Sequence, residues 1–196
     1  MFLLGLTGSI GMGKSTTAQM FVDQGCALWD ADAAVHRLYG VGGPAVEPMG
    51  EAFPEAILEG AVSRERLKEI IGRDPTALKK IEAIVHPLVG ADRASFIADA
   101  ETDIVVLDIP LLFETGGNAH MDAVVCVITS EAVQRERVLA RGTMTEAQFE
   151  TIKAKQMPAE DKAAQSDYVI QTDTIEQARA QVHSVVTDIR EKMANA

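Results

Sequence analysis

A glycine-rich segment near the start of the chain constrains its fold more than any other feature. Residues 8–15 read GSIGMGKS, a complete G-x-x-x-x-G-K-[ST] pattern. The apolar run 2–6 precedes this pattern, and a helix-like run over 16–22 follows it. Glycines let backbone N–H groups close around phosphate oxygens, and the start of a helix adds partial positive charge. The order of strand, loop and helix therefore predicts a phosphate-binding loop, and an ordinary glycine-rich turn is the alternative.

We expect this loop to hold the phosphates of a nucleotide together with a magnesium ion. Lys14 is expected to reach the β- and γ-phosphates, and the Ser15 hydroxyl is expected to bind Mg²⁺. An arginine from a later helix is expected to complete the site. The predicted nucleotide-binding residues are Gly8, Gly11, Met12, Gly13, Lys14, Ser15, Thr16 and Arg141.

The overall charge limits the partners that this chain can have. It has 196 residues, 47% of them hydrophobic, and a formal net charge of −11. This hydrophobic content supports one well-packed core, and an acidic surface repels the nucleic-acid backbone, so we expect no nucleic-acid partner. A phosphate site must then build its own positive patch, for which the candidates are Lys14, Arg37, Arg64, Arg137 and Arg141.

The cysteines and the chain start favour a cytoplasmic protein. Cys26 and Cys126 lie in apolar segments and lack the spacing of metal ligands, so both are expected to be buried free thiols. The N-terminus has no basic segment and only a short apolar run, which does not fit a signal peptide. Because no apolar stretch approaches the length of a membrane span, we also expect no membrane partner.

Short apolar segments that alternate with helical ones indicate the fold class. The continuously apolar runs 104–107 and 124–128 are typical of strands buried on both faces of a parallel sheet. Helix-start signals lie between the strands, at Ser130, at Thr145 with Gln148, at Thr174 with Gln177, at Asp74 before Pro75, and at Pro158. The predicted strands are Phe2–Thr7, Cys26–Trp29, Ile104–Asp108, Ala123–Thr129 and Tyr168–Gln171. We therefore expect an α/β protein of the P-loop NTPase type, a doubly wound five-stranded parallel sheet with its ligand at the carboxyl ends of the strands.

Residues 31–100 break the alternation of strands and helices. They show helical periodicity and no convincing strand, and they are far longer than a simple crossover requires. We interpret them as a helical insertion that binds a second substrate, closed by His86 and Pro87, with plain helical packing as the alternative. The expected organisation is a single domain over 1–196, divided into a core (1–30, 101–134 and 156–196), the insertion (31–100) and a small lid (135–155).

Aspartates at the predicted strand ends are candidates for the chemistry. Asp30 and Asp32 follow the second strand, where a carboxylate can accept the proton of an attacking hydroxyl. Acids two residues apart point in different directions, so one is expected to react and the other to cap the next helix; two caps are the alternative. Asp108 ends the third strand, where it either supports the metal or forms a turn.

Side chains with helical spacing predict a lid that carries positive charge. Intervals of three and four place Gln134, Arg137 and Arg141 on one face of a helix. Arginines that swing over a bound nucleotide can stabilise the charge of a transferring phosphoryl group, and the turn that follows suits a movable lid. Surface ion pairs, for instance between Glu131 and Arg135, are the alternative.

Two histidines and an apolar triplet are weaker candidates for substrate contact. His36 lies four residues after Asp32, and neither His36 nor His86 has neighbours with metal-ligand spacing. Residues 111–113 form either part of the core or an apolar wall of a substrate cleft.

Taken together, these motifs resemble those of the dephospho-coenzyme A kinase family over nearly the whole chain. Beyond the loop, the ordered matches are Asp30-Ala31-Asp32, His36, Arg64 with Leu67, His86-Pro87-Leu88, Pro110-Leu111-Leu112-Phe113-Glu114, the set Gln134, Arg137 and Arg141, Gln156, and Asp167-Tyr168-Val169-Ile170. This chain departs from the family pattern at Ser9, Met12 and Thr172, where glycine, serine and asparagine are usual. We expect the backbone at Ser9 to avoid positive φ.

The resemblance implies a kinase that transfers the γ-phosphoryl group of ATP to the ribose 3′-hydroxyl of dephospho-CoA, with ATP and Mg²⁺ as cofactors. It implies that Asp32 is the catalytic base and that Arg141 belongs to the lid. The full set of expected catalytic residues is Asp32, Lys14, Arg141 and Arg137. The expected substrate-binding residues are Asp32, His36, Arg64, His86, Pro87, Leu111, Leu112 and Phe113. The expected metal ligands are Ser15 and Asp108.

Other functions remain as alternatives at this stage. Another P-loop kinase that acts on a nucleoside monophosphate or a sugar acid would share the scaffold, and so would a non-catalytic nucleotide-binding module. A GTPase requires an N-K-x-D motif and a D-x-x-G motif, and the sequence has neither in the expected place. We expect a monomer or a weak homo-oligomer.

Overall fold

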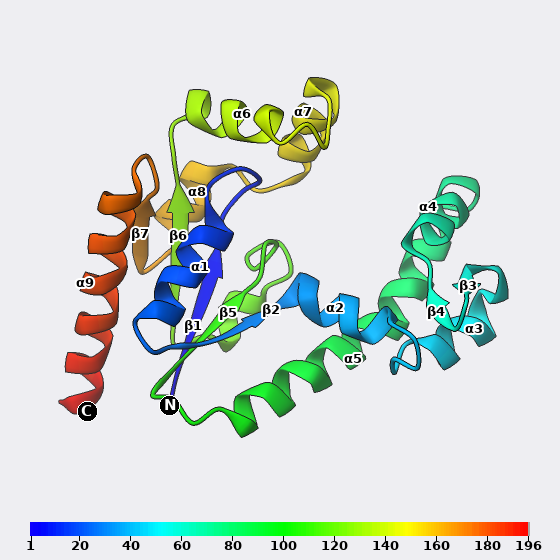
Figure 1. Ribbon diagram of the computed structural model, residues 1–196, viewed down its shortest axis with the longest axis horizontal. Helices are drawn as coiled ribbons and strands as arrows, with labels where there is room; N and C mark the ends of the chain where they lie inside the picture. Colours follow the sequence, from blue (N-terminus) through cyan, green and yellow to red (C-terminus); the bar gives the residue numbers. More distant parts are fainter. Residues whose placement is uncertain (196) are drawn as a thin grey trace. The chain divides into compact units, whose positions relative to one another are not determined.

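The computed structural model describes residues 1–195, which form two compact units. One unit comprises residues 1–29 and 100–195, and the other comprises residues 30–99. The main sheet has five strands in the order β2-β5-β1-β6-β7 (Figure 1). The strands are β1 (Phe2–Thr7), β2 (Ala27–Asp30), β5 (Ile104–Asp108), β6 (Ala123–Ile128) and β7 (Tyr168–Gln171). These positions agree with the predicted strands to within one residue at each end, which confirms the expected fold class.

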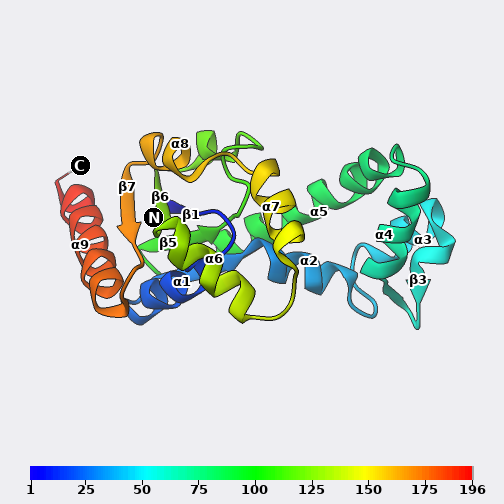
Figure 2. The same cartoon turned by 90° about the horizontal axis from the view of Figure 1, so that it is seen from above.

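Burial explains why the strands have continuously apolar sequences. Every residue of β5 is buried, as are the first five of the six residues of β6. Both strands pair in parallel with β1, where Leu4 lies opposite Val106 on one side and Ala123 on the other. Helices cover the two faces of the sheet, since α1 (Lys14–Asp23) and α8 (Ala159–Ala164) lie on opposite sides of it (Figure 2).

Predicted helix-start signals set the boundaries of the helices in the first unit. Ser130 caps α6 (Glu131–Ala140) by accepting a hydrogen bond from the N–H of Val133, and Thr145 with Gln148 forms a complete capping box on α7 (Glu146–Lys155). Thr174 caps α9 (Ile175–Ala194), but the reciprocal half of the predicted box is missing because Gln177 bonds to Gln171 instead. Pro158 precedes α8, as expected, and η2 (Gly117–His120) is a short turn before β6. In Figure 1, α6 and α7 lie beyond the carboxyl ends of the strands.

The second unit is a helical cluster with its own apolar core. Leu38, Met49, Phe53, Leu67 and Ile81 are among the buried residues of this core. The elements are α2 (Ala31–Tyr39), α3 (Val46–Ala52), η1 (Pro54–Ala56), β3 (Ile57–Leu58), β4 (Ala61–Val62), α4 (Arg64–Arg73) and α5 (Ala77–Asp99).

Several expectations for the second unit were wrong. A small hairpin, β3–β4, stands where no strand was expected, because two-residue strands around a Glu59–Gly60 turn with positive φ leave no periodic signal. His86 and Pro87 do not close the insertion: they lie inside α5, which continues to Asp99. The helix tolerates Pro87 although proline has no N–H to donate to the carbonyl four residues earlier. Asp74 was expected to cap a helix that starts at Pro75. Its carboxylate instead accepts hydrogen bonds from the N–H and the hydroxyl of Thr76, and α5 starts only at Ala77.

Both cysteines are buried free thiols, as predicted. Burial raises the pKa of Cys26 and of Cys126 to about 11, so neither thiol is ionised at neutral pH. Over residues 1–195, none of the helices combines the length and apolarity needed to cross a membrane.

Candidate active site

The phosphate loop connects β1 to α1 through a tight turn that depends on glycine. Gly11 and Gly13 have φ values of +78° and +88°, a region that residues with a Cβ rarely adopt. At Gly8, a Cβ would lie 2.4 Å from Cγ2 of Val127, so a side chain there is excluded by close packing. Ser9 is not among the residues with positive φ, which confirms that expectation. The loop therefore has the backbone shape in which successive N–H groups surround an anion at a helix start.

Lys14 and Asp108 form an ion pair at the carboxyl ends of the strands. Lys14 is the first residue of α1, and Asp108 is the last residue of β5. The Asp108 side chain is 1% exposed and that of Lys14 is 16% exposed, so this pair is largely shielded from water. Asp108 thereby holds the Lys14 ammonium group at the loop, where this group can offer a positive charge to an anion although the chain as a whole is acidic.

The three lid residues on α6 have different environments. Gln134 is buried, and its Nε2 donates to the carbonyl oxygen of Ile10 at 2.7 Å. Arg137 donates to the hydroxyl and the carbonyl oxygen of Thr172, at 3.1 and 2.6 Å. Arg141 caps the end of α6 and is exposed. The alternative pairing of Glu131 with Arg135 is not found, because Glu131 pairs with Lys153 and Arg135 with Glu146.

Thr172 connects the loop to α6, a role that sequence reasoning missed. Its hydroxyl lies 2.7 Å from the carbonyl oxygen of Met12, to which it donates, and it also accepts from Arg137. A Cβ on Gly13 would lie 3.0 Å from this hydroxyl oxygen. A cavity of about 140 Å³ opens here, lined among others by Gly13, Arg137, Arg141 and Thr172. The unusual threonine is thus compatible with the loop and orients the guanidinium of Arg137 at a cavity wall.

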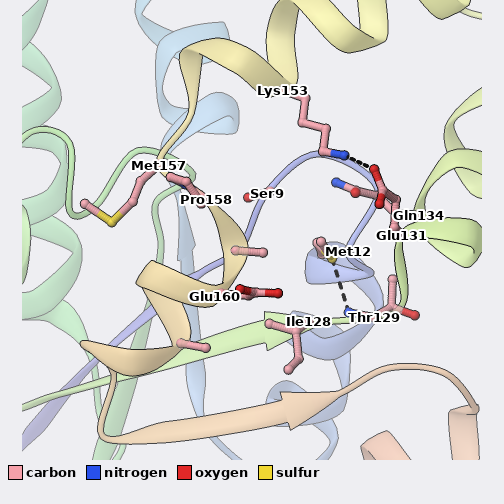
Figure 3. Close-up of a pocket in the computed structure, with 12 residues that line it drawn as sticks. Ser9, Met12, Ile128, Thr129, Glu131, Gln134, Lys153, Met157, Pro158 and Glu160 are labelled. Carbon is pink, nitrogen blue, oxygen red and sulfur yellow. Dashed lines mark hydrogen bonds and ion pairs between the residues drawn. The ribbon is translucent and has the colours of Figure 1, made fainter.

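A larger cavity of about 560 Å³ lies on another side of the loop (Figure 3). Ser9 and Met12 contribute to its wall, and the Sδ of Met12 accepts a hydrogen bond from the N–H of Thr129. The ion pair between Lys153 and Glu131 closes one side of the cavity in this view. The loop is therefore supported by Gln134 of α6 and by a backbone N–H at the end of β6, as well as by its own backbone.

The apolar triplet after β5 divides between core and surface. Leu112 has no exposed surface and Phe113 is 9% exposed, and both pack with Val124. Leu111, in contrast, is 43% exposed. Among these three expected substrate-binding residues, the structure leaves only Leu111 with a substantial accessible face; the other two serve as core.

The second unit presents its candidate residues to solvent. Asp30 caps α2 by accepting a hydrogen bond from the N–H of Ala33 at 2.8 Å. Asp32 is exposed in the first turn of the same helix, and no hydrogen bond to its side chain is found within residues 1–195. His36 on α2 is exposed, as are His86 and Pro87 on α5. Capping by Asp30 therefore leaves Asp32 as the carboxylate available for chemistry.

Arg64, the remaining predicted substrate ligand, begins α4 and is exposed. Its guanidinium lies over the ring of Tyr39, 5.9 Å from the ring centroid. Burial is the main reason that the pKa of Tyr39 lies above its usual value, and the positive charge of Arg64 opposes this rise. Stacking of this kind orients a guanidinium while leaving its donors available to a phosphate.

The chemistry of the available donors fits Mg²⁺. The hydroxyl of Ser15, at the start of α1, and the carboxylate of Asp108 supply hard oxygen ligands, which Mg²⁺ prefers. Residues 1–195 contain no cluster of three or more His, Cys, Asp or Glu side chains that could hold a metal alone. This agrees with the way Mg²⁺ binds in nucleotide sites, where substrate phosphates and water complete its coordination.

Comparison with known proteins identifies the family. The family model of dephospho-CoA kinase matches residues 2–177. A curated dephospho-CoA kinase from Ruegeria pomeroyi is 69% identical over 189 residues, which cover 96% of each chain. The crystal structure of TT1252 from Thermus thermophilus has a TM-score of 0.86 at 29% identity and covers 95% of this chain and 96% of its own. Dephospho-CoA kinase from Campylobacter jejuni has the same fold, with a TM-score of 0.71 at 23% identity over 97% and 98% of the two chains. The chain therefore belongs to the dephospho-CoA kinase family.

Proposed function

We propose that this protein phosphorylates the ribose 3′-hydroxyl of dephospho-CoA with ATP, giving coenzyme A and ADP. The observation that carries the proposal is the phosphate loop, formed by left-handed glycines, with Lys14 held beside it by Asp108. Membership of the dephospho-CoA kinase family supports the choice of acceptor. We expect the enzyme to be a monomer or a weak homo-oligomer.

In the proposed reaction, the acceptor hydroxyl oxygen attacks the γ-phosphorus of ATP. Its proton passes to the carboxylate of Asp32, and the bond from the γ-phosphorus to the β–γ bridging oxygen breaks, so that ADP leaves with the electron pair. Asp32 suits this role because Asp30 already caps the helix and leaves Asp32 exposed.

The positive side chains of the first unit would bind the triphosphate and balance its charge during transfer. Lys14 would exchange part of its contact with Asp108 for the phosphates, and Arg141, which is exposed at the end of α6, would approach them from the lid. Ser15 and Asp108 would hold Mg²⁺, which when bound neutralises charge on the phosphate oxygens. Arg137, tied to Thr172, would contribute to the wall of the nucleotide site.

Residues 30–99 would bind the acceptor, and residues 135–155 would act as the lid. His36, Arg64, His86 and Pro87 are exposed on the first of these segments. Leu111 would supply an apolar contact from the segment after β5. An arginine and histidines suit an acceptor that carries phosphate groups of its own.

Release of ADP by the purified protein tests the proposal directly. The assay compares dephospho-CoA with nucleoside monophosphates and sugar acids at equal concentration. We expect kcat/KM for dephospho-CoA to exceed that for every other acceptor, and the product to carry phosphate at the ribose 3′ position. A preference for a different acceptor would overturn the acceptor assignment while leaving the kinase assignment in place. If none of the acceptors supported ADP release, both assignments would be overturned.

A further inference from the structure

Residues 156 and 157 bond to two parts of the first unit, the phosphate loop and the segment 110–114. The side-chain oxygen of Gln156 accepts a hydrogen bond from the backbone N–H of Ile10 in the phosphate loop, at 3.0 Å. The backbone N–H of Met157 donates to Oε1 of Glu114, at 2.9 Å. Glu114 ends the segment 110–114, whose exposed Leu111 was proposed above as an acceptor contact. Two consecutive residues between α7 and α8 therefore join the phosphate loop to this segment.

The loop residue held by Gln156 is also held from its other side. Nε2 of Gln134 donates to the carbonyl oxygen of Ile10 at 2.7 Å, and Gln134 is only 1% exposed. Figure 3 shows Gln134 and Pro158 on opposite sides of the loop at Ser9. Both backbone polar groups of Ile10 are thus bonded to glutamine side chains, which determines the orientation of the chain as it enters Gly11. At Gly11 itself a Cβ would lie 3.0 Å from the backbone oxygen of Gln134, so the loop has no space to shift toward α6.

Glu114, which bonds to Met157, is also held in place by Lys162. Nζ of Lys162, a residue with no exposed surface, lies 2.9 Å from Oε1 of Glu114 and donates to the carbonyl oxygen of Pro110 at 3.0 Å. Lys162 therefore binds both the first and the last residue of the segment 110–114. Burial alone would raise the pKa of Glu114, but the bonds from Lys162 and Met157 outweigh it and hold the pKa below its ordinary value. The carboxylate is ionised at neutral pH and keeps both donors.

We propose that Gln156 and Glu114 are positioning residues that couple the conformation of the phosphate loop to that of the segment 110–114. The oxygen by which each acts is already bonded to the protein, so neither is assigned a contact with substrate. Ile10, Gln156, Met157 and Glu114 form an unbroken series of bonded groups, and Lys162 secures its far end. A change at Glu114 should therefore alter ATP binding although Glu114 lies outside the nucleotide-binding residues. The inference rests on the proposed function only in naming the segment 110–114 as an acceptor contact.

The first test replaces Gln156 and measures ATP binding without acceptor by titration calorimetry, together with KM and kcat for ATP. In Gln156→Leu the N–H of Ile10 loses its acceptor, and we expect the Kd and KM for ATP to rise roughly fivefold, as for one lost hydrogen bond. Gln156→Glu keeps an oxygen that accepts this N–H and should restore both values to within about twofold. Gln24→Leu is the matched control. Gln24 follows the last residue of α1, and its side chain bonds to His183 and not to the phosphate loop, so this change should leave ATP binding unchanged.

The second test asks whether the two residues act through each other. Glu114→Gln keeps an acceptor atom but loses the charge that attracts Lys162, so we expect a rise of about twofold to threefold in the Kd for ATP. In the double variant, the loss should be clearly smaller than the product of the two single losses. The inference is overturned if Gln156→Leu binds ATP as tightly as the unchanged protein, or if the double variant raises the Kd for ATP by the full product of the two single effects. Because ATP binding is measured without acceptor, failure of the dephospho-CoA assay is a separate outcome.

Discussion

The two compact units differ in how they hold their candidate functional side chains. In the unit with the phosphate loop, Asp108, Gln134 and Lys162 are at most 1% exposed, and each is bonded to another polar group at the site. In the unit formed by residues 30–99, the candidates Asp32 and His36 project from helices into solvent. The core of that unit is apolar and supports the helices rather than the individual functional groups.

We therefore expect the two units to bind their ligands in different ways. Buried, mutually bonded side chains cost little further ordering when a ligand binds, so the nucleotide half is preorganised for a triphosphate. Exposed side chains on a stable helical support can adjust to a large acceptor, but each must be ordered on binding. Substitutions should therefore disturb ATP binding through supporting residues in the first unit, and acceptor use mainly through contacting residues in the second.

The largest effect should follow from Asp32→Asn. An amide cannot take the acceptor proton, so we expect kcat to fall by about 10²–10⁴-fold. Because Asp32 is exposed, the Kd for ATP and the melting temperature should stay unchanged. Single-turnover kinetics and ATP titration measure the two quantities separately. Asp30→Asn is the control, since asparagine also caps helices well and should preserve most activity; a larger loss there than in Asp32→Asn would reverse the assignment of the two acids.

Lys14→Met should be nearly as damaging, but through both activity and stability. We expect kcat/KM to fall by about 10²–10³-fold, since a charge aimed at the transferring group is removed. The same change removes one partner of the largely buried ion pair between Lys14 and Asp108, which should destabilise the fold by about 3 kcal/mol. Adding Asp108→Asn should restore much of the stability, measured by urea unfolding, and none of the activity. Recovery of turnover in the double variant would contradict the role given to Lys14.

Two arginines allow the contrast between the units to be tested with one type of substitution. Arg137→Lys loses the planar guanidinium that binds the hydroxyl and the carbonyl oxygen of Thr172, so we expect the KM for ATP to rise roughly tenfold. Arg64→Lys keeps the exposed charge but loses the planar donors and their stacking on Tyr39, so we expect the KM for dephospho-CoA to rise by about threefold and that for ATP to stay constant. Steady-state kinetics with each substrate varied in turn would show this. Equal effects of both variants on ATP would remove the distinction between the units.

The parts of the molecule that could be predicted from sequence are those with a local signal. β5 and β6 follow from continuous apolar runs, and the phosphate loop follows from glycine spacing next to β1. The hairpin β3–β4 was missed because two residues per strand are too few to show alternation. Pro87 was taken as a boundary, although the surrounding helical turns of α5 stabilise the helix across it.

The supporting contacts of the site have no local signal at all. Gln156 bonds to Ile10 across 146 residues, and Thr172 bonds to Arg137 across 35 residues. Only the strand order of the folded sheet brings such groups together. Helical spacing did place Gln134, Arg137 and Arg141 on α6, but it did not distinguish the two that bond to the protein from Arg141, which is exposed.

The smallest effect concerns stability against acid. The pKa of Glu114 is lowered in the folded protein, although burial opposes this, because Lys162 and the N–H of Met157 bond to its ionised form. The stabilisation by this carboxylate is therefore complete above its unfolded pKa, and it is lost as the pH falls through the lower folded value. Glu114→Gln should lower the melting temperature at pH 7 by roughly 4–8 °C, for a loss of about 2 kcal/mol. The difference from the unchanged protein should begin to shrink as the pH falls below about 4, near the unfolded pKa, and it should vanish only below the lower folded pKa, where both side chains are neutral.

An exposed ion pair in the other unit provides the control for this measurement. Arg37 pairs with Asp92 between α2 and α5 at 2.6 Å, but its side chain is 53% exposed, so Arg37→Gln should cost less than about 1 kcal/mol at any pH. Salt should weaken this pair more than the pair of Glu114 with the fully buried Lys162, because screening acts mainly on exposed charges. If Arg37→Gln and Glu114→Gln lowered the melting temperature equally at pH 7, the supporting ion pair of the nucleotide half would be no stronger than a surface pair. Bonding to the buried Lys162 would then not preorganise the nucleotide half at Glu114.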